Sequence, residues 1–260
     1  DQVDLGPQWK ALVGVRHDSY TQDVRNNRLA VSNRQSLSAT SPRAGLVYQP
    51  SKRWSLYASA AKGFRPNSGI SIANQAFPAE RSRSYELGAK LDTGKLTGTV
   101  AVYDIRKSNV LTTNPANTDF AIAAGEVGSR GLELDVSGEV ARGLRVSGAY
   151  AYTDASVTRG DTTIVTGSRL ANVPRHSANL LATQQFALGT GAASVGGGVQ
   201  YVGERLGDVA ASSSFTLPAY TTARLLASYS PNAKLRLAVN VENLFNRSYY
   251  ASSYSQLWVA

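Results

Sequence analysis

The residues that could carry out catalysis are few and widely separated along the chain. It contains no cysteine and two histidines, His17 and His176. Two isolated histidines are too few for a zinc centre, and neither belongs to an HExxH pair. The nucleophile motif GxSxG is absent, because GSRG at 128–131 lacks its spacing, and the carboxylates are spread over different segments. The sequence therefore predicts a protein that is not an enzyme and that has no resident cofactor or metal.

Basic residues outnumber acidic ones. The chain has 27 Lys and Arg against 18 Asp and Glu, for a formal net charge of +9. Such an excess suits nucleic acid, anionic lipid or an anionic ligand. The sequence has no lysine-rich run and no RNA-binding fingerprint, so no nucleic-acid partner is expected. Anionic lipid and an anionic ligand remain as interpretations of the charge.

The elements that must position these groups alternate with a period of two. In LELDVSGEV, residues 132–140, leucines and valines occupy one face, whereas Glu133, Asp135 and Glu139 occupy the other. This alternation is typical of a strand with one apolar and one charged face. It recurs along the chain and predicts eleven strands, at about 9–16, 42–49, 54–65, 81–91, 96–107, 125–139, 144–157, 175–187, 193–205, 218–229 and 235–247.

Strand length and connection length both favour a membrane barrel. Several predicted strands have 10 to 15 residues, and a tilted membrane-spanning strand needs about 9–11. Short connections rich in Pro, Gly, Asn and Asp alternate with long ones at about 17–41, 66–80, 108–124, 158–174 and 206–217. Short periplasmic turns that alternate with long outer loops are typical of outer-membrane barrels. The fold class predicted is therefore all-β, an antiparallel transmembrane β-barrel.

The charged face of the strands indicates a wet or plugged interior. If Leu132 and Leu134 meet lipid, Glu133 and Asp135 point into the lumen. Several kcal/mol would be lost for each unpaired charge in a dry core. The same alternation places further charged side chains in the lumen: Glu86, Lys90, Glu139, Arg145, Arg224, Arg236 and Glu242.

Eleven strands cannot close a bacterial single-chain barrel, which has an even number of strands. Unpaired strand edges are not tolerated in lipid. Residues 1–260 are therefore expected to be a fragment of a larger barrel, from which at least one returning strand is absent.

The last predicted strand introduces a family resemblance. NVENLFNRSYY, residues 240–250, resembles the penultimate-strand motif of TonB-dependent outer-membrane receptors, in which Asn-Leu-Phe precedes a Tyr-Tyr pair. Other segments resemble the ferric-siderophore branch of that family in the same order along the chain: YASAAKGFRPN (57–67), ERSRSYELGAKLD (80–92), YDIRKSNVLTTN (103–114), GSRGLELDVSGEV (128–140), AYAYTDASVT (149–158), NVPRHSANL (172–180) and VGERLGD (202–208).

The resemblance implies a 22-stranded barrel with an N-terminal plug in its lumen, located in the bacterial outer membrane. It implies active uptake of a ferric siderophore, driven by TonB acting on the N-terminal part. The resemblance implies that residues 1–260 are the C-terminal portion of the receptor β-barrel domain, and that the plug, the TonB box and the final strand have no counterpart in them. Two alternatives stay open, a passive porin-like channel and a soluble all-β binding module.

The resemblance also directs attention to basic residues at the outer rim. Ferric siderophores are often anionic, and arginines at strand–loop junctions could contact them. The candidate ligand-binding residues are Arg65, Arg81, Arg169 and Arg205. The alternative partner of such residues is lipopolysaccharide, whose phosphates basic rim residues can bind.

Overall fold

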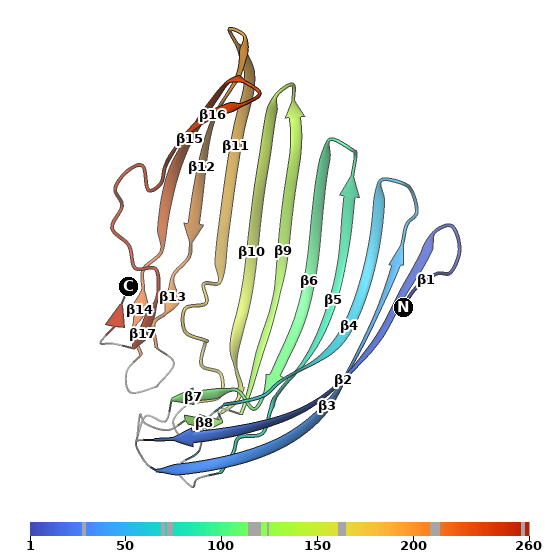
Figure 1. The fold of residues 1–260 in the computed structure, drawn as a ribbon, viewed down its shortest axis with the longest axis vertical. Helices are drawn as coiled ribbons and strands as arrows, with labels where there is room; N and C mark the ends of the chain where they lie inside the picture. Colours follow the sequence, from blue (N-terminus) through green and yellow to red (C-terminus); the bar gives the residue numbers. More distant parts are fainter. Residues whose placement is uncertain are drawn as a thin grey trace.

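The computed structural model describes residues 1–27, 30–68, 71, 75–113, 121–123, 125–160, 165–208, 214–255 and 258–259. Twelve strands in this part of the chain form one curved antiparallel sheet (Figure 1). Among the described residues, no helix has the length and apolar character needed to cross a membrane.

Each strand of the large sheet pairs with the next large-sheet strand along the chain. The order is β1 (Gln2–Asp4), β2 (Trp9–Asn26), β3 (Val31–Tyr48), β4 (Trp54–Arg65), β5 (Glu80–Asp92), β6 (Leu96–Ser108), β9 (Glu126–Ala141), β10 (Leu144–Arg159), β11 (His176–Leu188), β12 (Gly191–Val202), β15 (Tyr220–Asn232) and β16 (Leu235–Val241). All eleven predicted strands are present in the large sheet, where the prediction missed the short β1; it also missed the short strands outside that sheet. The antiparallel all-β fold is thus confirmed.

The two ends of the sheet differ in their connections. Tight turns join the strands at one end, the turn end, which lies at the top of Figure 1. At the opposite loop end, small hairpins occupy the connections: β7 (Leu111–Thr113) with β8 (Ala121–Ala123), β13 (Arg205–Leu206) with β14 (Thr216–Leu217), and β17 (Ser253–Ser255) with β18 (Trp258–Val259). The predicted alternation of short and long connections holds from β3 onward.

The prediction of a long loop at 17–41 is wrong. β2 continues to Asn26 and β3 begins at Val31, so that the segment is mostly a paired hairpin that extends past the neighbouring strands (Figure 1). The apolar alternation stops near His17, but the backbone pairing does not. Of the predicted long connection at 158–174, residues 161–164 lie outside the described part of the chain.

Cross-strand register divides the sheet into two faces. The outer face carries Leu87 and the residues aligned with it, including Ala58, Val102 and Leu132. Large apolar side chains are exposed along this face: Val13, Leu56, Leu87, Val102, Leu134, Leu180, Val199, Leu225 and Val239. The intervening residues form the inner face. From Arg81 to Leu87 of β5, the outer-face residues are exposed and the inner-face residues are half-buried. An apolar exposed band is the surface that a membrane barrel presents to lipid.

Aromatic residues lie at both edges of the apolar band. Trp9, Tyr48 and Trp54 occupy strand ends beside the tight turns, and the rings of Trp9 and Tyr48 are 4.6 Å apart. Tyr85 and Tyr152 lie on the same face toward the loop end. These positions match the two aromatic girdles expected at membrane interfaces.

The strand β16 ends in an asparagine turn. Asn243 and Asn246 adopt φ of 48° and 50°, a left-handed conformation that asparagine tolerates better than most residues. The Asn243 amide donates to the Arg247 carbonyl, and its oxygen accepts from the Arg247 amide, both at 2.9 Å. The strand predicted to reach residue 247 therefore stops at Val241, and the motif NLFNR forms the turn that ends it.

Candidate binding site at the mouth and inner face

The inner face carries the charged residues that the sequence placed in the lumen. Lys90, Thr99 and Asp135 align across β5, β6 and β9, and Glu133 aligns with Ala101. Arg145 lies opposite Glu139 on β10 and β9. The predicted division between apolar and charged faces is therefore present in the structure. A polar inner face of this kind can contact water, a polar ligand or a polar domain.

One aromatic ring on this inner face, that of Tyr57, lies over a glycine of the neighbouring strand. The Tyr57 hydroxyl donates to Glu86 at 2.6 Å, and the Lys90 ammonium is 5.2 Å from the Tyr57 ring centre. The ring covers Gly88, where a Cβ would come within 2.5 Å of it. A side chain at position 88 would therefore displace the ring, which is held between an acidic and a basic side chain. Such a fixed surface is suited to contact a partner without rearrangement.

At the loop end, an ion cluster lines the mouth of the inner face. The Glu80 carboxylate, with a side chain only 7% exposed, accepts from Arg65 at 3.0 Å and lies 3.4 Å from the Lys107 ammonium. One carboxylate between two cations leaves a net positive charge. Arg65 remains 70% exposed at its side chain, so that it can meet a ligand while Glu80 holds it in place.

The buried Asn67 and the half-buried Asn109 tie the surrounding segments together. The Asn67 amide donates to the carbonyls of Pro78 and Asn109, both at 2.7 Å, and the Asn109 amide donates to Ala79 at 2.8 Å. The sequence prediction missed both residues, because a single asparagine in a loop gives no periodic signal. Their role here is to fix the connections that frame the ion cluster.

Arg205 occupies a second cluster at the loop end. It is 1% exposed, donates to the carbonyls of Tyr250 and Ala251, and lies over the Tyr220 ring at 5.5 Å. Tyr220 in turn stacks on Tyr249 at 4.2 Å. Arg205 thus anchors the segment after the asparagine turn, with its guanidinium directed into protein.

Asn172 links the same cluster to the preceding loop. It has a φ of 60°, its backbone amide donates to Leu206, and its side chain bonds the Ser253 carbonyl at 2.6 Å and the Ser253 amide at 2.9 Å. Three chain segments that are far apart in sequence meet at this one residue.

The four candidate arginines do not form one site. Arg65 lies at the mouth, whereas Arg81 lies on the outer face, two positions along β5 from Arg83. Arg169 forms an isolated bridge with Ser156, and its guanidinium is 3.5 Å from the Val173 carbonyl. Arg205 is buried as described. Among the four candidate arginines, Arg65 is therefore the one that is both exposed and directed toward the inner face.

A polar cavity of about 300 Å³ lies further along the inner face. It is lined by Asn179, Gln200, Thr222, Arg224 and Glu242, together with strand backbone. No cluster of three or more His, Cys, Asp or Glu side chains that could hold a metal ion occurs within the described ranges. The inner face therefore offers hydrogen-bonding and charged groups to a polar ligand.

Comparison with known proteins identifies the family. The profile described as "TonB dependent receptor-like, beta-barrel" matches residues 1–244. The chain belongs to the TonB-dependent receptor family. The chain is 45% identical to the Metal-pseudopaline receptor CntO of Pseudomonas aeruginosa, over 100% of this chain and 38% of that protein. It is 31% identical to the ferrichrome outer membrane transporter/phage receptor of Escherichia coli, over 95% of this chain and 34% of that protein.

Solved receptor structures share the fold. The siderophore receptor PiuA of Acinetobacter baumannii superposes with a TM-score of 0.84 at 25% identity, over 100% of this chain and 40% of that one. The chain thus spans about two fifths of the length of the relatives it matches. Members of the family are outer-membrane β-barrels that act as transport receptors rather than enzymes. This TonB-dependent receptor chain accordingly lies in the bacterial outer membrane as barrel wall.

Proposed function

We propose that this chain is part of the wall of an active outer-membrane receptor that takes up a metal–chelator complex, with TonB as the energy-coupling partner. A plug and the remaining barrel strands would come from the rest of the protein. The similarity to full-length receptors, of which this chain spans about two fifths, supports this arrangement. The polar inner face supports it too, since a polar plug can pack against charged residues without leaving them unpaired.

For the cargo, we propose a metal complex of the pseudopaline type. The observation that carries this is the 45% identity to the metal-pseudopaline receptor over 100% of this chain. The ferric siderophore expected from the sequence is the second candidate, favoured by 31% identity to the ferrichrome transporter. The two differ in cargo and share the mode of transport.

Within the mouth, we propose that Arg65 contacts the cargo. It is exposed, directed inward and held by Glu80 beside Lys107. Arg81, Arg169 and Arg205 are proposed to serve other purposes, since Arg81 faces outward and the other two donate to backbone carbonyls. A charge-assisted hydrogen bond from the Arg65 guanidinium to an anionic group of the cargo would make the receptor favour an anionic metal complex.

The test is uptake of labelled metal by cells that lack the full-length gene. Cells receive radioactive iron, zinc, nickel or cobalt, each with pseudopaline or with ferrichrome as chelator. Loss of pseudopaline-dependent uptake, restored by the gene only when TonB is present, supports the proposal. Loss of ferrichrome-dependent uptake alone would transfer the assignment to ferric siderophores. Uptake that persists without TonB would favour the passive channel.

Variants assign the role of Arg65. Arg65→Gln should weaken binding of the transported complex about tenfold, the effect of losing one hydrogen bond to a charged group. Arg53→Gln, in the turn at the opposite end of β4, removes the same charge and should leave binding unchanged. Equal affinities for the two variants would exclude Arg65 from the binding site.

A further inference from the structure

The inner face of the hairpin of β2 and β3 remains covered beyond the membrane. In the outer half of the hairpin, residues 18–26 and 31–39, burial alternates along both strands, with exposed side chains on the outer face. A hairpin with water on both faces would expose both sets of side chains. On the inner face they are half-buried instead: Asp18, Tyr20, Gln22 and Val24 on β2, and Asn33, Gln35, Leu37 and Ala39 on β3. Another part of the chain therefore packs against the inner face.

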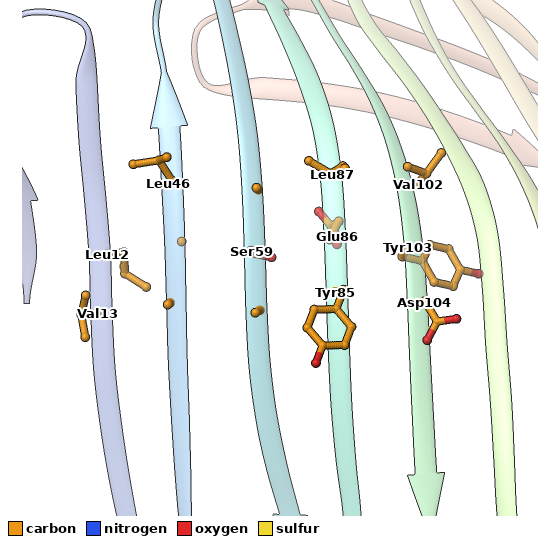
Figure 2. Close-up of a pocket in the computed structure, with 14 residues that line it drawn as sticks. Leu12, Val13, Leu46, Ser59, Tyr85, Glu86, Leu87, Val102, Tyr103 and Asp104 are labelled. Carbon is orange, nitrogen blue, oxygen red and sulfur yellow. The ribbon is translucent and has the colours of Figure 1, made fainter.

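The covering segment is not a neighbouring strand. In the membrane half, β2, β3, β4 and β5 run side by side in one sheet, and Figure 2 shows Val13, Leu46, Ser59 and Leu87 on these four strands in turn. The pairing of β3 with β4 ends at Arg43, and no strand continues it within the part of the chain that the structure describes. Contacts of the inner face therefore decide where the outer half of the hairpin lies.

Two glutamines bond the connection between β4 and β5 to this inner face. Gln35 Nε2 donates to the Phe77 carbonyl at 2.5 Å, and Gln22 Nε2 donates to Ser68 Oγ at 3.2 Å. Gln22 and Gln35 are directly opposite each other in the ladder. The Tyr20 hydroxyl donates to Gln22 Oε1, so that the Gln22 amide nitrogen is directed at Ser68. The hairpin thus holds the connection at two points, one near each of its ends.

Both points adjoin the ion cluster at the mouth. Ser68 is three residues after Arg65, and Phe77 is three residues before Glu80. The connection therefore begins and ends at the two members of the 3.0 Å ion pair. Phe77 and Glu80 are each only 6% exposed, so that the end of the connection is packed into the protein. A displacement of the connection would move Arg65 and Glu80 relative to each other.

A buried hydrogen bond links the third charged group to the same connection. Asn67 is 4% exposed and donates to the Asn109 carbonyl at 2.7 Å, and Asn109 lies two residues after Lys107. Lys107 lies 3.4 Å from the Glu80 carboxylate that Arg65 also contacts. The two cations repel each other and share one carboxylate. Their spacing therefore depends on the backbone that carries them, and the hairpin holds that backbone.

We propose that the outer half of the hairpin is a positioning element for cargo binding, with Gln22 and Gln35 as its positioning residues. This inference rests on the proposed function, because it requires the mouth cluster to bind the cargo. Neither glutamine touches the cargo, and each fixes the connection that sets the spacing of Arg65 and Lys107. Two cations held in place bind an anion more tightly than two mobile ones, because less freedom is lost on binding. Amide side chains suit this role, since they donate hydrogen bonds without adding a charge beside the cluster.

The test measures binding of nickel–pseudopaline and of ferrichrome to the full-length receptor in detergent. Gln22→Met with Gln35→Met keeps the side-chain lengths and removes both donors. This variant should bind the transported complex roughly tenfold more weakly, as expected when two hydrogen bonds between uncharged groups are lost. Amide exchange should become faster in residues 75–79 and stay unchanged in β5 and β6. The matched control, Thr21→Val with Ser36→Ala, alters the adjacent pair on the exposed face and should bind as the wild type does.

Two further measurements separate positioning from a general loss of structure. In a receptor that already carries Arg65→Gln, the two methionine substitutions should weaken binding by less than about twofold more, because one remaining cation has no spacing to lose. On cells, the methionine variant should need about tenfold more cargo for half-maximal uptake and should reach the wild-type maximal rate at saturation. A folding defect would lower the maximal rate instead.

The outcomes distinguish the role of the hairpin from the contact of Arg65 with the cargo. Wild-type affinity in the methionine variant, beside weakened binding in Arg65→Gln, would overturn the role of the hairpin and leave the proposed function standing. The opposite result would overturn the contact of Arg65 with the cargo and assign the effect of the hairpin to Lys107. Where Arg65→Gln does weaken binding, an undiminished effect of the methionine substitutions in that background would also overturn positioning, because the glutamines would then act on the fold.

Discussion

The hairpin of β2 and β3 contains two regions that share one fold but differ in chemistry. In the membrane half, Val13 and Val15 point outward and are 61% and 74% exposed. In the outer half, beyond His17, the same face carries Ser19, Thr21 and Asp23, opposite equally polar residues of β3. The backbone ladder is continuous across both halves. Apolar alternation therefore marks where a strand meets lipid, and it does not mark where the strand ends.

Polar side-chain pairs stabilise the outer half in place of lipid contact. His17 bonds Thr40 at 2.9 Å, Thr21 bonds Ser36 at 3.1 Å, and Asp23 lies 3.7 Å from Arg34. Each such cross-strand pair contributes roughly 0.2–1 kcal/mol. The membrane half depends on an apolar surface that must remain uncharged, whereas the outer half depends on many small, replaceable contributions.

The largest difference between the two ends of the molecule is their accessibility. Asn27 lies at the tip of the hairpin, and Gly94 lies in a tight turn at the opposite end. In a full-length receptor with no other cysteine, Asn27→Cys should react completely with an impermeant thiol reagent on intact cells. Gly94→Cys should react only after the outer membrane is breached. Labelling of Gly94→Cys alone on intact cells would invert the orientation of the sheet.

A charge on the outer face should have opposite consequences in the two halves of β2. Val13→Arg places a cation against lipid and should destabilise the folded receptor by about 2–4 kcal/mol if that position lies near the bilayer midplane, and less toward the interface. Ser19→Arg, six residues along the same face, should change stability by less than about 0.5 kcal/mol, as at an ordinary exposed surface position. Urea unfolding in lipid vesicles measures both. Comparable losses would show that the membrane boundary does not lie between these residues.

The membrane wall could be predicted from sequence because lipid imposes a regular pattern. The predicted strands at 54–65 and 96–107 match β4 and β6 to within one residue, since apolar residues recur there at every second position. Above the membrane no such constraint acts. The outer hairpin, the Glu80 ion cluster and the contacts of Asn67 and Asn172 therefore left no periodic signal. Arg205 was recognised as a residue at a strand–loop junction, but its burial depends on segments more than 40 residues away.

Removal of the part-buried side-chain contacts of Asn172 should speed amide exchange in the loop-end clusters. This effect should be larger than that of replacing an exposed side chain in the outer hairpin. Asn172→Ala loses the three hydrogen bonds to Ser253 and places in the turn a residue less suited than asparagine to positive φ. Each of these losses costs of the order of 1 kcal/mol. Faster amide exchange in residues 203–208 and 249–253, with unchanged exchange in β5 and β6, is the expected result.

Asn172→Gly separates the two contributions. Glycine keeps the backbone conformation at no steric cost but removes the side-chain hydrogen bonds. Its exchange rates should fall between those of the wild type and Asn172→Ala. If Asn172→Gly exchanged as fast as Asn172→Ala, backbone strain would contribute nothing, and if it matched the wild type, the bonds to Ser253 would contribute nothing.

The smallest expected effect tests how the outer half of the hairpin is stabilised. Thr21 and Ser36 face each other with their hydroxyl oxygens 3.1 Å apart, and both are exposed. A double-mutant cycle with Thr21→Val and Ser36→Ala should give a coupling energy of roughly 0.2–1 kcal/mol in unfolding of the hairpin, measured by amide exchange of Ser19 and Ser38. The same cycle across the membrane half, with Val13→Ala and Ala44→Gly, should show coupling through apolar contact without a hydrogen bond. A Thr21–Ser36 coupling near zero would mean that the backbone ladder alone sustains the outer half, because each hydroxyl would then bond water as well as it bonds its partner.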